Sequence, residues 1–283
     1  MLSYYSHSQD INWQGHRGCR GLMPENSLPA FTKALELGVN TLELDVVISK
    51  DKEVVVSHDP WMSPQFCMAP GGEKLEGEVQ DMPNLYTLTY KEIAEYDCGS
   101  IGNSNFPEQQ KLKIYKPRLI EVFKLAEKYC KDQRRDEVYY NIEIKSRPEW
   151  DGKYHPEYWD FCDIVYNTVD AYVPWQRVNI QSFDHRILDY FHKMYPNVRL
   201  AVLEETDKDP ERVIRELGFI PDIYSPYFKL LKQKGLKWLH DNGMLVNVWT
   251  VNTVEDMKEM INMGVDGIIT DYPNLIDELG TER

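Results

Sequence analysis

Short apolar strand patterns alternate with amphipathic helix patterns through most of this 283-residue chain, and this alternation restricts the possible folds more than any other feature. Strands are predicted near residues 11–15, 41–48, 138–145, 178–182, 199–203, 223–224, 245–251 and 267–270. Helices are predicted from Leu28 to the stop signal at Gly38, at 119–129, 158–172 and 185–194, near Val213, before His240, and at 254–263. Eight strand–helix units predict a TIM (β/α)8 barrel, in which reactive side chains gather at the carboxyl ends of the strands.

Residues from about 61 to 116 interrupt this alternation. The stretch is rich in Pro, Gly, Asn, Tyr and Met, and only Tyr90–Glu95 predicts a helix. Since 42% of all residues are hydrophobic, the chain can bury one large core, and α/β barrels of this length form one domain. We therefore expect a single domain over residues 1–283, with a small insertion after the second strand unit.

The strand around Glu43 carries two carboxylates on one face. Glu43 and Asp45 alternate with apolar residues at the two-residue period of a strand, so both side chains point to the same side. Burying two like charges is costly unless a compensating charge is present, and a divalent cation is the simplest one. A polar turn and a second strand with the valines 54–56 follow, and that strand ends at His58, which can transfer protons near neutral pH.

A third acid follows the same pattern in the sequence YYNIEIK. Asn141, Glu143 and Lys145 share one face of their strand, so Glu43, Asp45 and Glu143 can meet inside a barrel. An all-oxygen site favours Mg²⁺ or Ca²⁺ over zinc. The alternative for each acid taken alone is a solvent-facing position on a half-exposed strand.

Other residues at strand ends can be interpreted in two ways, as structural residues or as residues of a functional site. His16 can be a capping or core histidine, Arg17 an ordinary surface cation and His58 a turn residue, or all three can take part in chemistry. Phe183 and Trp249 can cap the barrel core or form the wall of a ligand pocket.

Charge and cysteine usage exclude several functions. The formal net charge of −14 argues against a nucleic-acid partner and against attraction to anionic membranes. Residues 1–10 show no signal-peptide pattern and no apolar run reaches about 20 residues, so we expect no membrane insertion and a cytoplasmic location. A periplasmic or secreted location is the alternative if a signal has been removed. The five cysteines contain no CxxC pair, which predicts small apolar side chains or free thiols at 19, 67, 98, 130 and 162.

Eight motifs in order along the chain resemble the glycerophosphodiester phosphodiesterase family. These are HRG, PENSLPAF, ELDV, SHDP, NIEIK, QSF, WTVN and DGIITDYP, running from His16 to Pro273. The resemblance implies a TIM barrel with an insertion after the second strand unit. It also implies hydrolysis of small glycerophosphodiesters, such as glycerophosphocholine and glycerophosphoethanolamine, to glycerol 3-phosphate and an alcohol with the help of a divalent metal.

The resemblance also implies roles for individual residues. The family's acid/base pair corresponds to His16 and His58. Its metal-binding carboxylates correspond to Glu43, Asp45 and Glu143, and its phosphate contacts correspond to Arg17 and Lys145. We further expect the insertion to select the leaving alcohol, without taking part in bond cleavage, through its aromatic and apolar residues, namely Trp61, Phe66, Met68, Tyr86 and Phe106, with Trp249 across the cleft. The alternative is a flap that only stabilises the barrel by packing against it. The competing hypotheses are a lipid phosphodiesterase of the lysophospholipase D or sphingomyelinase D type and a barrel that binds phosphodiesters without cleaving them.

Overall fold

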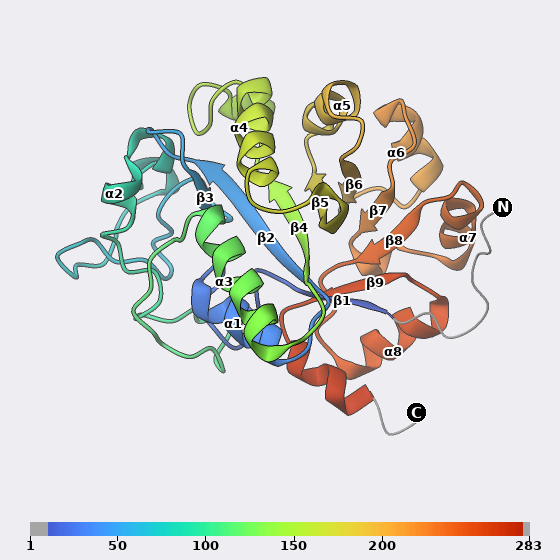
Figure 1. Cartoon of the computed structure of the whole chain (residues 1–283), viewed down its shortest axis with the longest axis horizontal. Helices are drawn as coiled ribbons and strands as arrows, with labels where there is room; N and C mark the ends of the chain where they lie inside the picture. Colours follow the sequence, from blue (N-terminus) through green and yellow to red (C-terminus); the bar gives the residue numbers. More distant parts are fainter. Residues whose placement is uncertain (1–10, 280–283) are drawn as a thin grey trace.

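A closed barrel of parallel strands surrounded by helices forms the centre of the molecule in the computed structural model, which describes residues 11–279 (Figure 1). Within that range eight strands form the barrel: β1 (Asn12–Gly15), β2 (Thr41–Ile48), β4 (Tyr139–Ile144), β5 (Val178–Ser182), β6 (Arg199–Glu204), β7 (Ile223–Pro226), β8 (Leu245–Val248) and β9 (Gly267–Thr270). Strand β1 pairs in parallel with both β2 and β9 and so closes the barrel. The predicted TIM barrel is confirmed.

Helices cover the outside of the barrel between successive strands (Figure 1). They are α1 (Leu28–Glu36), α3 (Leu119–Gln133), α4 (Tyr158–Asp170), α5 (His185–Met194), α6 (Pro210–Leu217), α7 (Gln233–Asp241) and α8 (Val254–Met263). Short 3₁₀ turns lie at η1 (Val79–Asp81), η2 (Leu85–Thr87), η3 (Pro148–Trp150), η4 (Trp175–Arg177), η5 (Phe228–Leu230) and η6 (Pro273–Leu279). Polar side chains define several helix starts because they accept a hydrogen bond from a free backbone N–H, as Ser27 does for α1 and Thr253 for α8.

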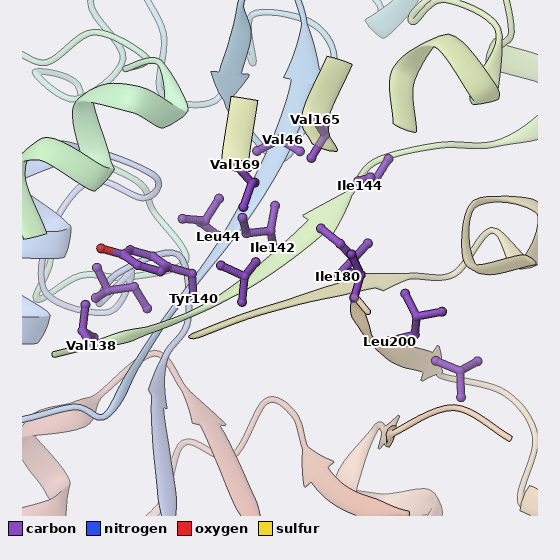
Figure 2. Close-up of a cluster of buried hydrophobic side chains, with 14 of the residues drawn as sticks. Leu44, Val46, Val138, Tyr140, Ile142, Ile144, Val165, Val169, Ile180 and Leu200 are labelled. Atoms are coloured by element: carbon purple, nitrogen blue, oxygen red, sulfur yellow. The ribbon is translucent and has the colours of Figure 1, made fainter. Parts of the chain in front are cut away.

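The main core lies between the outer surface of the strands and the helices. On β2 and β4, apolar residues such as Leu44 and Ile142 face outward toward Val165 and Val169 of α4 (Figure 2). The residues between them along each strand therefore face the barrel interior. This alternation places Glu43, Asp45 and Glu143 inside, as their sequence pattern predicted.

The segment between β2 and α3 leaves the barrel and forms its own small core. Strand β3 (Val54–Val56) pairs antiparallel with β2, and the residues after it form loops and the short helix α2 (Tyr90–Ile93), at one side of the barrel (Figure 1). Apolar side chains pack there on the face of β2 and β3 that is turned away from the main core: Val47, Val55, Met62, Phe66, Cys67, Leu85, Ile93, Cys98 and Ile114. The division into one domain with an insertion at about 61–116 agrees with this packing and stays our proposal.

Cys67 and Cys98 form a disulfide inside this second core, which corrects the prediction that all five cysteines are thiols. The two residues lie 31 positions apart in irregular structure, so no strand or helix period indicated that they meet. Cys19, Cys130 and Cys162 are buried free thiols, as expected.

Most predicted element boundaries lie within a few residues of the observed ones, with two larger differences. Strand β8 ends at Val248 rather than at residue 251, and α3 continues to Gln133 beyond its predicted end at residue 129. The helix predicted at Tyr90–Glu95 ends at Ile93. The N-terminal segment, on which the prediction of no signal peptide rests, lies outside the described residues. Between residues 11 and 279, no helix combines the length and the apolar character that crossing a bilayer requires.

Candidate active site

Three buried acids meet at the carboxyl ends of β2 and β4. The register of the two strands places Asp45 opposite Glu143, and Glu43 lies two residues before Asp45 on the same face. One carboxylate oxygen from each of the three residues lies within 4.8 Å of the others, and each residue is at most 7% exposed. The expected meeting of the three acids inside the barrel is confirmed.

Hydrogen bonds hold two of these carboxylates in place. Glu43 accepts one from the Arg17 backbone N–H at 2.9 Å and one from the Gln181 amide at 2.8 Å. The Asn26 amide donates to Asp45 Oδ2 at 2.8 Å. Asp45 Oδ1, although buried, accepts no hydrogen bond from any described residue. An orphaned buried carboxylate oxygen in a cluster of acids fits a metal ligand, because a cation would supply the missing partner.

Mutual repulsion changes the protonation of the acids when no cation is present. Burial, with the negative charges of Asp45 and Glu143, raises the pKa of Glu43 well above its usual range. Burial also raises the pKa of Glu143 to about 7, although the ammonium of Lys145 opposes this shift. Burial acts on Asp45 in the same direction, but the nearby cations, Arg17 first among them, and the hydrogen bond from Asn26 together outweigh it and hold the pKa of Asp45 below its ordinary value.

His16 lies at the end of β1 and contacts a residue from the other end of the chain. Its Nδ1 lies 2.6 Å from Asp271 Oδ1, just beyond β9, and its Nε2 lies 4.0 Å from Glu43. Arg20 and Asn252 also donate hydrogen bonds to Asp271. Burial lowers the pKa of His16 to about 4, despite the opposing charge of Asp271. Asp271 thus holds the ring while Nε2 remains directed toward the acids.

A second imidazole reaches the site from the end of β3. His58 Nδ1 lies 2.8 Å from Asp59 Oδ1, an arrangement that parallels His16 and Asp271. Burial and the nearby cations Arg17 and Lys145 lower the pKa of His58. Each histidine therefore has one ring nitrogen held by an aspartate and the other available for proton transfer.

Arg17 and Lys145 lie among the acids. Arg17 Nη1 contacts Glu25 at 2.9 Å and its Nε lies 3.3 Å from Asp45, whereas Lys145 Nζ lies 2.6 Å from Glu143 and 3.8 Å from Asp45. The chain can turn sharply after Arg17 because Gly18 has a φ of 85°, and a Cβ there would lie 2.7 Å from the backbone of α1. The HRG sequence thereby brings an imidazole and a guanidinium to one point.

These residues line a cavity of about 190 Å³ at the carboxyl ends of the barrel strands. Its wall consists of His16, Arg17, Arg20, Glu43, His58, Glu143, Lys145, Gln181, Phe183, Leu203, Glu205, Trp249, Thr250 and Ile269. The rings of Phe183 and Trp249 meet edge to face, with centroids 5.7 Å apart. A larger surface hollow of about 880 Å³, formed by loops at the opposite ends of β5 and β6, contains none of the acids or histidines of this cavity.

None of the insertion residues expected to select the alcohol lines this cavity. Phe66 is instead buried in the second core. The insertion reaches the cavity indirectly, since Phe106 lies under the guanidinium of Arg20 at 4.6 Å and the Gln109 amide donates to the Arg20 carbonyl at 2.8 Å.

Comparison with known proteins decides the family. The model of the glycerophosphoryl diester phosphodiesterase family matches residues 16–275. The chain belongs to this family. As a glycerophosphodiester phosphodiesterase it is an enzyme, a phosphoric diester hydrolase. The glycerophosphodiester phosphodiesterase of Caldanaerobacter subterraneus subsp. tengcongensis is 31% identical over 267 residues, covering 93% of this chain and 95% of that protein.

Solved structures agree with this family assignment. A Silicibacter pomeroyi protein assigned to the same phosphodiesterases matches with a TM-score of 0.83 and 31% identity, covering 96% of this chain and 95% of that one. An Oleispira antarctica phosphodiesterase, solved with its product sn-glycerol-3-phosphate, has a TM-score of 0.74 at 18% identity and covers 95% and 96% of the two chains. The second similarity supports the fold.

The structure brings together all nine site residues predicted from the sequence, and adds others that sequence reasoning missed. The missed residues are Asp59 and Asp271, which hold the histidines, Asn26 and Gln181, which hold the acids, and Arg20 and Glu205 in the cavity wall. Asp271 lies in the motif DGIITDYP directly after a predicted strand, and this position at a strand end could have indicated a site residue.

Proposed function

We propose that this phosphodiesterase hydrolyses small glycerophosphodiesters, such as glycerophosphocholine and glycerophosphoethanolamine, in a metal-dependent reaction with His16 and His58 as the acid/base pair. The observation that carries the proposal is the pair of aspartate-held histidines in the wall of one cavity that Glu43 and Glu143 also line, with Asp45 beside these acids. The products are glycerol 3-phosphate and an alcohol.

The three carboxylates would hold one divalent cation, Glu43, Asp45 and Glu143 each supplying oxygen. Oxygen ligands alone favour Mg²⁺ or Ca²⁺. When bound, the cation would neutralise negative charge that develops on the phosphoryl oxygens in the transition state. It would also relieve the repulsion that raises the pKa of Glu43.

Arg17 and Lys145 are the proposed phosphate contacts. Both side chains are mostly buried beside the acids, so they are already oriented and partly desolvated before a substrate arrives. The guanidinium can donate two parallel hydrogen bonds to a phosphodiester, whereas the ammonium acts as a point charge.

His16 and His58 would transfer protons through their Nε2 atoms. One histidine removes a proton from the attacking hydroxyl, either of water or of the glycerol 2-OH, and the other protonates the leaving alkoxide oxygen. Because Asp271 and Asp59 each contact an Nδ1, each ring keeps the orientation that this exchange requires.

The cavity size favours small head groups over lipids. A volume of about 190 Å³ lies below the roughly 300 Å³ at which pockets for drug-sized ligands begin. Phe183 and Trp249 form the apolar wall against which the carbon atoms of the substrate would pack. This argues against the alternative of a lysophospholipase D or sphingomyelinase D.

The disulfide between Cys67 and Cys98 provides evidence on the cellular compartment of the protein. Cysteine pairs persist in oxidising environments and are rare in the cytosol, so Cys67–Cys98 favours the periplasmic or secreted alternative over the cytoplasmic one. The negative charge leaves a small-molecule substrate, rather than nucleic acid, as the proposed partner.

Phosphorus NMR tests the proposed function directly. The purified protein is incubated with glycerophosphocholine, glycerophosphoethanolamine, glycerophosphoglycerol and lysophosphatidylcholine, with Mg²⁺, with Ca²⁺ and with a chelator. We expect glycerol 3-phosphate from the three small diesters in the presence of metal and none with chelator. Exclusive turnover of the lysophospholipid, or turnover that the chelator does not affect, would contradict the proposal.

A further inference from the structure

Lys116 is a buried cation that the reaction described above does not use. It lies at the end of the insertion, two residues before Arg118, the N-cap of α3, and is only 6% exposed. The backbone beside it is fixed, because the Val56 N–H donates to the Pro117 carbonyl at 2.8 Å and Arg118 forms an antiparallel bridge with Val55. Lys116 therefore runs alongside the strand that delivers His58.

The Lys116 ammonium begins a chain of contacts that ends at the imidazole. Its Nζ donates to Ser57 Oγ at 2.8 Å, and this hydroxyl, which is fully buried, donates to the backbone carbonyl of Asp59 at 2.6 Å. The Asp59 carboxylate then holds His58 Nδ1 at 2.8 Å. Because the Ser57 hydroxyl donates its proton to the Asp59 backbone carbonyl, it can only accept from Lys116.

Charge explains why a lysine can occupy this place. Burial lowers the pKa of Lys116, but the negative charges of Asp59, Glu25 and Asp45 oppose this shift, and the centroid of the Phe66 ring lies 5.7 Å from the ammonium. A buried ammonium is costly without such partners, so a residue that only filled space would be apolar. Lys116 does not line the cavity, which excludes it as a direct substrate contact.

We infer that Lys116 is a positioning residue, which holds the Ser57–His58–Asp59 turn so that the His58 ring is oriented for proton transfer. The inference rests on the proposed role of His58. It predicts that the insertion serves the chemical step through this lysine, in addition to any effect on substrate choice.

Steady-state kinetics on glycerophosphocholine at saturating metal test the inference. The variants are Lys116→Met, which keeps length and removes the charge, and Ser57→Ala, which removes the bridging hydroxyl. The control is Lys113→Met, an exposed lysine in the same segment. We expect Lys116→Met to lower kcat roughly 10- to 100-fold with KM within about twofold, as for other residues that orient a reacting group. The control keeps the parent kcat.

A double variant separates positioning from general structural support. In a His58→Ala background, adding Lys116→Met should lower kcat by less than about a further threefold, because the lysine acts through the missing imidazole. The inference would be overturned if Lys116→Met lowered kcat in the His58→Ala background as much as it does in the parent protein, or if the single variant Lys116→Met kept the parent kcat. If Lys116→Met does not fold, Ser57→Ala is measured instead, in the parent protein and in His58→Ala, and the same outcomes support or overturn the inference. If His58→Ala itself keeps the parent rate while Lys116→Met does not, the acid/base assignment is what fails.

Discussion

Asp45 and Glu143 occupy directly paired positions in the register between β2 and β4. Their carboxylates are therefore fixed beside one another by strand pairing, while Glu43 joins them from two residues earlier on β2. Because the backbone sets this arrangement, the acids are forced together before any cation is present. Burial, together with the repulsion from the neighbouring acids, raises the pKa values of Glu43 and Glu143.

Removing one of these acids should abolish metal binding without unfolding the barrel. In Glu43→Gln the repulsion with Asp45 and Glu143 is relieved, so the melting temperature of the metal-free protein should not fall. Turnover should fall by orders of magnitude, and the rise in melting temperature on adding Mg²⁺ or Ca²⁺ should disappear. Calorimetry with and without metal measures this. A metal-induced rise that survives in Glu43→Gln would contradict the assignment.

The stability of the metal-free protein should depend on pH through the ionisation of Glu143. Its folded pKa of about 7 lies above the ordinary value of 4.5, so between these pH values the folded state binds more protons than the unfolded state. Its contribution to the free energy of unfolding is therefore present below about pH 4.5 and lost as pH rises to about 7, by on the order of 3 kcal/mol. Denaturant unfolding in chelator, compared with Glu143→Gln, isolates this contribution. Parallel pH curves for the two proteins would show that Glu143 ionises normally.

Both histidines should be required for turnover. We expect a bell-shaped pH profile and a loss of roughly 100-fold or more in kcat for each of His16→Ala and His58→Ala. The double variant should lose little beyond the more damaged single one, because two residues that act on one transition state are not additive. A single variant that keeps near-parent activity would exclude that histidine from the mechanism.

Phe106 connects the insertion to the cavity wall. Phe106→Ala removes the ring under Arg20, an interaction worth about 0.5–1 kcal/mol, so the Arg20 side chain should become less ordered. The expected result is a change of two- to fivefold in the ratio of kcat/KM between choline and glycerol head groups, since 1.4 kcal/mol corresponds to tenfold. Tyr115→Ala, an exposed aromatic residue in the same insertion that does not line the cavity, is the control. An unchanged ratio would mean that the insertion does not select the substrate through Arg20.

The disulfide should stabilise the insertion more than the barrel. Closing a loop with a sequence separation of 31 is expected to contribute about 2–4 kcal/mol to the free energy of unfolding. Cys67→Ser with Cys98→Ser, compared with the oxidised parent in denaturant unfolding, measures it, and Cys130→Ser serves as the control for a buried thiol. Equal stability of the oxidised and doubly substituted proteins would contradict this expectation.

The sequence predicted those features that depend on local periodicity. The two-residue period placed Glu43 with Asp45 and Glu143 with Lys145, and the strand ends placed His16 and His58, because a barrel collects all such ends on one face. The pairing of Asp45 with Glu143 depends on strand register, which local pattern does not define. Asp271, Lys116 and the cysteine pair act through contacts between distant or irregular segments, so no period indicated them.

The contact between His16 and Asp271 spans 255 positions and joins the first barrel strand to the last. During synthesis from the N-terminus, a chain that has emerged only as far as β8 contains the three clustered acids but lacks the partner that orients His16. Catalytic competence should therefore arise late and in one step, when β9 closes against β1.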